Sequence, residues 1–445
     1  MFKTIKNAWS IPELRKKLLF TLLIIVVFRF GSVIPVPFLD VGALKGLMDA
    51  VNQEGTALGY LNMLTGGAFA NATMFAMGIT PYINSSIIMQ LLTVAIPALE
   101  RMAKEGEEGR KRITAITRYV TVALGLIQGA AYYSFLRFSG YNGQSIVKYS
   151  EDGFATQAFV AVIIVLTFTA GTALMMWMGE QINVKGVGNG ISILLFSGIV
   201  ARLPVTFGHL WSFLQAAIQD PTNYGQYYFF VPLFVILFLA VIWVIVFMND
   251  SERRIPVQYA KRVVGRKMYG GQSTHIPIKV AMSGVMPIIF ASSILSIPST
   301  IQMFVHPEAG SVGAIILNAL SSSGPIYAVL YFILIIMFAY FYLTIQYNPI
   351  EMANNLRQSN GTIPGVRPGR PTADFIAKIL SKITLIGSLF LAVIALLPII
   401  FGALTGMHNL SLGGTSIIIL VGVALETVKQ LESQMMMRHY KGFLD

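Results

Sequence analysis

The chain has 445 residues, of which 55% are hydrophobic and 12% are charged. Soluble domains carry about 25% charged residues, so this composition excludes an ordinary soluble domain and predicts an all-α polytopic membrane protein. The absence of cysteine excludes disulfides, thiolate catalysis and cysteine-ligated metals together. The formal net charge of +12 becomes informative once it is placed along the chain.

Apolar runs long enough to cross a bilayer recur along the whole chain. They predict ten spans, at residues 18–34, 74–96, 113–136, 155–178, 187–206, 227–248, 277–301, 326–346, 379–402 and 415–436. The basic segment before the first span has no small-residue cleavage site. We therefore expect a retained cytoplasmic leader and not a removed signal peptide.

The basic residues are distributed unequally between the two sides of these spans. With the amino terminus inside, 27 of the 32 Lys and Arg residues fall on the inner side. Four fall on the outer side (Lys45, Arg137, Lys148 and Arg202), and Arg29 lies within the first span. By the positive-inside rule, this asymmetry predicts ten spans with both termini in the cytoplasm.

Two apolar stretches, residues 78–88 and 284–294, share a pattern. Each has a glycine, a proline three residues later, an isoleucine two beyond it and a serine three beyond that. They lie in the second and seventh spans, which run in opposite directions, as copies of a five-helix unit must. The pattern predicts two inverted halves, residues 1–212 and 213–445, with chance similarity of hydrophobic segments as the alternative. We expect each proline to bend its helix.

The outer segment between the first two spans ends in residues 60–73, which are too apolar for an exposed loop and too short and glycine-rich for a span. Non-helical backbone survives at membrane depth only inside protein or beside a water-filled cavity, so these residues predict a re-entrant half-helix. An amphipathic helix on the outer surface is the alternative.

Two long inner loops, residues 249–276 and 347–372, are rich in basic residues, and prolines and glycines in the second fix a turn that projects its arginines. One interpretation is ordinary positive-inside bias, with attraction to anionic lipids of about 1 kcal/mol per basic residue. The other is a docking surface for a partner that is acidic or made of RNA.

The sequence offers no catalytic constellation. Its five histidines are scattered, residues 186–190 lack the spacing of a dinucleotide-binding loop, and there is no Walker A motif. We expect no enzyme activity, no metal and no cofactor. The predicted spans contain almost no ionisable residue beyond Arg29 and Glu426, which counts against an inverted-repeat secondary transporter, the main alternative.

Taken together, the motifs make the chain similar to the SecY family of bacterial protein-conducting channels over nearly its whole length. The residues that carry the resemblance are Gly66-Gly67, Gly78 to Ile83, Ser86 to Leu92, Lys104 to Glu107, Gly179 to Ile182, Gly188 to Ile193, Gln272 to His275, Pro287 to Ser293, Asn348-Pro349, Pro364 to Gly369 and Gly413 to Ser416. Each motif alone is weak, but their order is specific.

The resemblance implies two halves around a central hourglass pore, through which an unfolded polypeptide crosses the membrane. A lateral gate between spans two and seven would release hydrophobic segments into lipid. The implied pore ring is Ile79, Ile83, Ile191, Leu195, Ile289 and Ile419. At position 195 the family commonly has isoleucine, and we expect leucine, about as large and as apolar, to preserve the seal.

The resemblance assigns the other sites as follows. The plug below the ring would include Tyr60, Leu61, Leu64, Gly66, Gly67, Phe69, Asn71 and Thr73. The lateral gate would include Thr80, Asn84, Ser86, Ile87, Gln90, Ser292, Ser293 and Ser296. Partner docking would use Arg253, Arg254, Lys261, Arg262, Arg266, Lys267, Arg357, Arg367 and Arg370. The implied partners are the membrane subunits SecE and SecG, the SecA ATPase motor, the ribosome, signal sequences and anionic lipids, at the bacterial plasma membrane.

Overall fold

The computed structural model describes residues 2–52, 65–141, 144–149, 153–259, 262–264, 267–269, 273–282, 284–305, 325–405 and 414–441. Each of the ten predicted spans falls on a helix. These helices are α2 (Pro12–Gly31), α5 (Thr80–Ala95), α7 (Glu107–Phe138), α8 (Phe154–Lys185), α9 (Gly190–Gln219), α11 (Tyr227–Asp250), α12 (Met286–Val305), α14 (Pro325–Gln346), α16 (Arg370–Thr405) and α17 (Gly414–Lys441).

Within the described ranges, six helices are long and apolar enough to cross a membrane. A seventh span counts if α5 and α6 (Pro97–Lys104), bent by 101° at their junction, form one unit. The remaining predicted spans fall on α2, α12 and α17, which are shorter or carry more charge at their ends. The prediction of a polytopic α-helical membrane protein is confirmed, and the count of ten is consistent with it.

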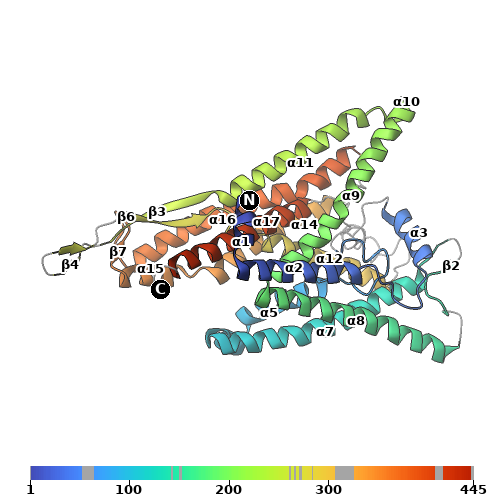
Figure 1. Ribbon diagram of the computed structural model, residues 1–445, viewed down its shortest axis with the longest axis horizontal. Coiled ribbons are helices and arrows are strands. Elements are labelled where there is room, and N and C mark those ends of the chain that lie inside the picture. Colours follow the sequence, from blue (N-terminus) through green and yellow to red (C-terminus); the bar gives the residue numbers. More distant parts are fainter. Residues whose placement is uncertain are drawn as a thin grey trace.

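The helices form two groups that meet along one seam (Figure 1). Helices α2, α5, α7 and α8 pack together in one group, and α11, α14, α16 and α17 pack in the other. Helix α9 contacts α8 on one side and α11 and α17 on the other, while α12 contacts both α5 and α7. The largest hydrophobic core therefore lies where the two groups meet.

The two helices that carry the shared pattern begin later than expected. Helix α5 starts at Thr80 and not at residue 74, and α12 starts at Met286 and not at residue 277. Gly78 and Gly284 both adopt positive φ, at 58° and 56°, which a helix cannot continue. Each proline then occupies the second helical position, where its missing N–H costs nothing. The expectation that these prolines bend their helices is wrong, and the two starts share one local backbone conformation.

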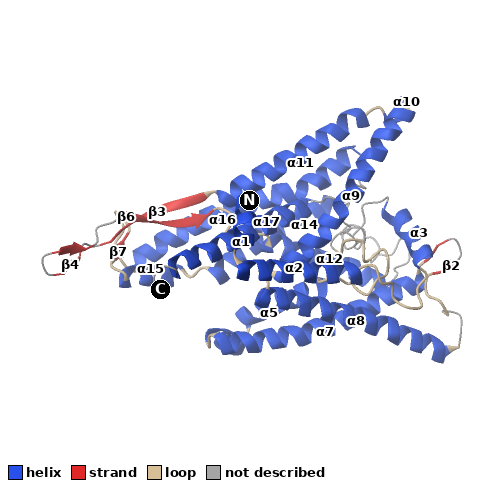
Figure 2. Ribbon diagram, viewed as in Figure 1, coloured by secondary structure: helices blue, strands red, loops and turns tan. Residues whose placement is uncertain are grey.

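The two basic loops form a small sheet that was not predicted (Figure 2). Strand β3 (Glu252–Tyr259) pairs antiparallel with β6 (Ser273–Lys279), and β7 (Gly361–Thr362) pairs with the end of β3. Beyond them, β4 (Arg262–Val264) pairs with β5 (Lys267–Tyr269). Alternate residues Ile255 and Val257 of β3 are buried against α15 (Pro349–Gln358) and the start of α16. The two loops are therefore joined through the pairing of β3 with β7, and β4 and β5 form a separate pair.

At the opposite end of the molecule, α3 (Val41–Asn52) and the two-residue strands β1 (Gly140–Tyr141) and β2 (Gln144–Ser145) cover the helix ends (Figure 1). Asp40 precedes α3, and its Oδ1 accepts hydrogen bonds from the backbone N–H groups of Gly42 and Ala43, at 2.9 and 3.1 Å. These bonds, the one from Ala43 first, hold the pKa of the Asp40 carboxyl below its usual range. The short helices α1 (Phe2–Ser10) and α10 (Pro221–Tyr224) contact α17 and α9.

Candidate functional site

The six aliphatic residues of the predicted pore ring, here called the aliphatic cluster, come together in one core where the two groups of helices meet. Five of them are at most 9% exposed and Ile191 is half-buried, and they come from the start of α5, from α9, α12 and α17. Ile79 lies just before α5, yet its carbonyl accepts from the Ile83 N–H at 3.0 Å, so these two residues stay one turn apart. Buried aliphatic side chains of this kind offer water no hydrogen-bond partner.

The chemistry of this core is almost entirely apolar. No group of three or more histidine, aspartate or glutamate residues within metal-binding reach occurs in the described part of the chain. The intramembrane cation Arg29 lies near it and donates from Nε to the Ser197 hydroxyl at 3.3 Å and from its terminal nitrogen to the Ser197 carbonyl. Its guanidinium also lies 4.8 Å from the centre of the Phe28 ring.

The glycine-rich stretch before α9 is a capped junction. Asn189 Oδ1 accepts from the N–H groups of Ile191 and Ser192, at 3.1 and 3.4 Å, and Asn183 Oδ1 accepts from the Gly190 N–H at 2.7 Å. A Cβ at Gly190 would lie 1.9 Å from the Gly179 carbonyl oxygen, so α8 and α9 approach as closely as backbones can. The junction fixes the first turn of α9, which carries Ile191.

The re-entrant half-helix predicted at residues 60–73 is not helical in its described part. There, residues 65–72 form consecutive turns, Thr73 pairs with Pro35 in an isolated β-bridge, and turns resume at residue 74; residues 65–78 are here called the turn segment. Gly66 and Gly67 adopt positive φ, at 66° and 92°, which interrupts any helix. The alternative of a helix on the outer surface is also wrong for these residues, because Phe69 and Thr73 are at most 1% exposed. The plug residues Tyr60, Leu61 and Leu64 lie outside the described residues.

The turn segment fits closely among the helices of the first group. Tyr132 of α7 donates from its hydroxyl to the Phe69 carbonyl at 2.7 Å, and the two rings stack with centroids 4.4 Å apart. Asn71 donates back to the Gly67 carbonyl at 2.8 Å. A Cβ added at Gly171 of α8 would lie 1.9 Å from a carbonyl oxygen of the turn segment. The segment is thus a shaped unit of folded backbone, which the sequence alone did not reveal.

The predicted lateral-gate residues lie on two helices that contact each other, α5 and α12. On α5, Ile87 is buried, and Thr80, Asn84, Ser86 and Gln90 are half-buried. On α12, Ser292 and Ser293 are buried and Ser296 is half-buried. Gln90 donates to Ser86 at 3.3 Å, while Ser292 and Ser296 donate to carbonyls of their own helix.

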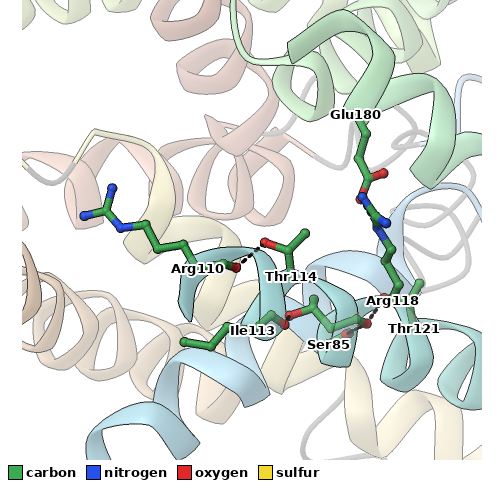
Figure 3. Close-up of polar contacts among 8 residues, drawn as sticks. Ser85, Arg110, Ile113, Thr114, Arg118, Thr121 and Glu180 are labelled. Carbon is green, nitrogen blue, oxygen red and sulfur yellow. Dashed lines mark hydrogen bonds and ion pairs between the residues drawn. The ribbon is translucent and has the colours of Figure 1, made fainter. Parts of the chain in front are cut away.

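A residue that the predicted gate omits links α5 to its neighbour (Figure 3). Ser85 is fully buried and donates from Oγ to the Thr117 carbonyl of α7 at 2.7 Å. That carbonyl also accepts from the Thr121 hydroxyl at 2.7 Å. One residue along α7, Arg118 pairs with Glu180 of α8 at 2.8 Å. Helices α5, α7 and α8 are therefore joined by polar bonds, a feature that requires knowing which helices are neighbours.

The docking residues within the described chain are exposed around the sheet. Arg253, Arg254, Arg357, Arg367 and Arg370 all face solvent, and Arg254 pairs with Glu252 at 2.7 Å. The Arg367 carbonyl accepts from the Thr372 hydroxyl at 2.8 Å, and Gly365 and Gly369 adopt positive φ, as a fixed turn requires. Arg262 and Lys267 lie on β4 and β5, whereas Lys261 and Arg266 lie outside the described residues.

Comparison with known proteins identifies the family to which the chain is similar. Residues 73–428 match the family model described as SecY. Curated relatives described as "Protein translocase subunit SecY" are 45% identical over 448 residues in Streptomyces griseus and 44% identical over 452 residues in Halalkalibacterium halodurans, with 100% of each chain covered. The solved "structure of a protein conducting channel" aligns with a TM-score of 0.63 at 17% identity, covering 94% of this chain and 92% of that one.

A second solved structure, described as "Sec61 in the Canine ribosome-channel complex from the endoplasmic reticulum", aligns with a TM-score of 0.60 at 18% identity and covers 94% of this chain and 92% of that one. At these identities the structural likeness defines the class of fold, that of the multi-pass protein-conducting channels. The match over most of the length, together with the identity to curated relatives, is decisive for the family. The chain belongs to the SecY family.

Proposed function

We propose that this protein is the channel-forming subunit of a protein translocase, which passes unfolded polypeptides across the membrane and releases hydrophobic segments sideways into lipid. The observation that carries the proposal is the aliphatic cluster, whose members lie in one core shared by the two groups of helices. We assign the six members of the cluster as the pore ring and residues 60–73, whose described part lies in the turn segment, as the plug. Membership of the SecY family supports both assignments.

The chemistry of the cluster suits this function. Aliphatic side chains exclude water and ions when they pack together, yet they impose no fixed hydrogen-bond geometry on what lies between them. They therefore accommodate any side chain of a passing polypeptide and close again behind it. A substrate-specific transporter needs directed polar groups instead, and coupled transport needs an ionisable residue at mid-depth.

Lateral release requires α5 and α12 to separate. A signal segment of about ten apolar residues contributes roughly 3–6 kcal/mol on insertion, at −0.3 to −0.6 kcal/mol each. Shifting a gate from mostly shut to mostly open takes about 5.5 kcal/mol. Because the two energies are comparable, the signal sequence and a docked partner together open the gate.

The exposed arginines around the sheet make this end of the molecule the docking surface for a cytoplasmic partner. Arg367 projects from a turn that the bond from the Thr372 hydroxyl and two glycines with positive φ fix, so little backbone entropy is lost when it binds a partner. The partners assigned here are the SecA motor and ribosomal RNA at the sheet, SecE and SecG along the membrane helices, and anionic lipids at the inner surface. The corresponding location is a bacterial plasma membrane, with both termini in the cytoplasm.

The halves assigned to this channel are residues 1–212 and 213–445, inverted relative to each other. The shared backbone at Gly78 and Gly284 supports this division, because both copies start a helix in the same way. An inverted-repeat transporter would share such halves. The apolar character of the aliphatic cluster favours the channel over that alternative.

The test is reconstitution of the protein into lipid vesicles with an ATP-driven motor and a secretory precursor. We expect ATP-dependent protection of the precursor from added protease, and loss of protection when Arg367→Glu reverses the docking charge. Ion-coupled uptake of a small solute without precursor protection would refute the proposal and establish the transporter instead.

A further inference from the structure

The turn segment is fastened to the first group of helices by one buried side chain in particular. Tyr132 is 1% exposed, and its hydroxyl is aimed at the Phe69 carbonyl, 2.7 Å away. Phe69 is equally buried, so its carbonyl has no access to bulk water. That carbonyl also accepts from the Ala72 N–H at 3.0 Å, so removing the Tyr132 hydroxyl breaks one buried hydrogen bond between α7 and the turn segment without leaving the carbonyl unpaired.

A second contact to the turn segment comes from residues of α2 and α9. Arg29 is fixed by its two bonds to Ser197, and its guanidinium lies directly against the Gly66 turn. A Cβ at Gly66 would lie 2.8 Å from Nη1 of Arg29 and 3.0 Å from the Gly198 carbonyl oxygen. Only glycine, here with φ of 66°, therefore fits at position 66.

Backbone bonds complete the attachment. The Val36 N–H donates to the Ala72 carbonyl at 2.9 Å, and the Met74 N–H donates to the Ile34 carbonyl at 3.1 Å. These partners, like Tyr132, Arg29 and Ser197, all precede residue 213. The bonds that reach the turn segment from them therefore connect it to the N-terminal half.

We infer that Tyr132 is a positioning residue that latches the turn segment to the N-terminal half, with Arg29 as the support against Gly66. The inference rests on the proposed function, in which the segment holds the described part of the plug of the channel. When α12 moves away from α5, the latched segment stays with α5, α7 and α8. Displacing it from the pore then requires breaking the Tyr132 bond as a separate step.

The experiment uses the absence of native cysteine. In full-length protein in vesicles, Ala70→Cys places one thiol in the turn segment, and labelling by a membrane-impermeant maleimide reports the exposure of that thiol. Tyr132→Phe keeps the ring stack and removes only the hydroxyl. We expect labelling at position 70 to become about fivefold faster, the change in equilibrium that corresponds to a hydrogen bond worth ~1 kcal/mol.

Matched controls separate a latch from general loosening of the fold. Tyr133→Phe removes a hydroxyl from the adjacent residue of α7 and is expected to leave the labelling rate unchanged. A thiol introduced by Ser388→Cys, at a site 1% exposed in α16, is expected to label at the same rate with and without Tyr132→Phe. Gly66→Ala, which forces a Cβ against Arg29, is expected to raise labelling at position 70 by a different route.

Unchanged labelling at position 70 in Tyr132→Phe, or an equal rise at position 388, would overturn the latch. Failure of the proposed function would be seen in a different measurement. In that case, vesicles with the unsubstituted protein would not protect the precursor, whatever the labelling rates were. Conversely, if the precursor is protected but Tyr132→Phe does not change the labelling rate, the channel proposal is supported and the latch proposal is refuted.

Discussion

Helices α5 and α12 begin with the same backbone conformation but are attached to the molecule differently. Helix α5 sends the buried Ser85 hydroxyl across to the carbonyl of Thr117, and α7 is tied in turn to α8. The buried Ser292 of α12 donates to the Ile289 carbonyl of its own helix, and α12 contacts α14 through the edge-on rings of Phe290 and Phe338, 5.7 Å apart.

Under the proposed function, this difference predicts which of the two helices moves when the gate opens. Separating α5 from α7 takes the buried Ser85 hydroxyl away from its acceptor in a nonpolar surrounding, which is costly, although the Thr117 carbonyl keeps its bond from the Thr121 hydroxyl. Sliding α12 leaves the Ser292 bond intact, because its donor and acceptor travel together, and the ring contact with α14 has no hydrogen bond to lose. We therefore assign α5 to the fixed wall of the gate and α12 to the moving one.

The largest expected effect comes from polar substitutions on the two sides of the aliphatic cluster. Ile83→Asn and Ile289→Asn each bury an amide without a partner, which costs the closed state on the order of 1–3 kcal/mol. We expect ion leak to rise on the order of tenfold and weak signal sequences to be accepted, by the usual conversion of about 1.4 kcal/mol per factor of ten. Conductance of reconstituted vesicles measures the leak, and Ile83→Leu is the control. Normal leak and normal signal stringency in both variants would contradict the assignment of the cluster as the seal.

Substitution of the two matched glycines comes next. Gly78→Ala and Gly284→Ala both impose a left-handed conformation on alanine, at about 1–2 kcal/mol. A Cβ at position 78 also lies 2.9 Å from Cγ2 of the buried Thr65, whereas among the described residues, chain neighbours aside, no atom lies within 4 Å of a Cβ at position 284. We expect the larger loss of thermal stability at position 78. Equal losses would show that the Thr65 contact adds nothing to the backbone strain.

A smaller effect separates the two serines. Ser85→Ala removes the bond between α5 and α7 and should destabilise the protein by ~1 kcal/mol. Ser292→Ala removes a bond within one helix and should change stability by only a few tenths of that. Denaturation in detergent compares the two directly. If Ser292→Ala proved the more damaging, the assignment of α12 as the moving wall would be wrong.

The smallest effect belongs to the pair between Arg118 and Glu180. The Arg118 side chain is 51% exposed, so the pair is partly screened by solvent. We expect Arg118→Gln to cost about 0.2–1 kcal/mol, and less at high salt. Stability measured at two ionic strengths tests this, with the isosteric Glu180→Gln as the matched partner. A cost independent of salt would indicate that packing of the side chains, and not their charge, holds the contact.

The sequence predicted the class and the approximate position of each span, because composition and apolar run length carry that information. The order of the motifs indicated the family, and the six aliphatic residues that the resemblance named lie in one core. It did not predict the sheet formed by the two basic loops, since pairing of β3 with β7 joins segments about a hundred residues apart. Residues 65–73 were expected to belong to a half-helix and are not helical, although Gly66 and Gly67 carried the contrary signal. The roles of Ser85 and Tyr132 depend on which helix lies opposite, and no local pattern specifies that.

The most direct test of the whole account joins the two walls of the gate. Cysteines introduced by Asn84→Cys on α5 and Ser292→Cys on α12 form a background-free pair, because the chain has no cysteine of its own. The account predicts that precursor transport stops when the disulfide is complete and returns when it is reduced, with either single variant unaffected by oxidant. Transport at the unmodified rate through fully cross-linked protein would contradict it.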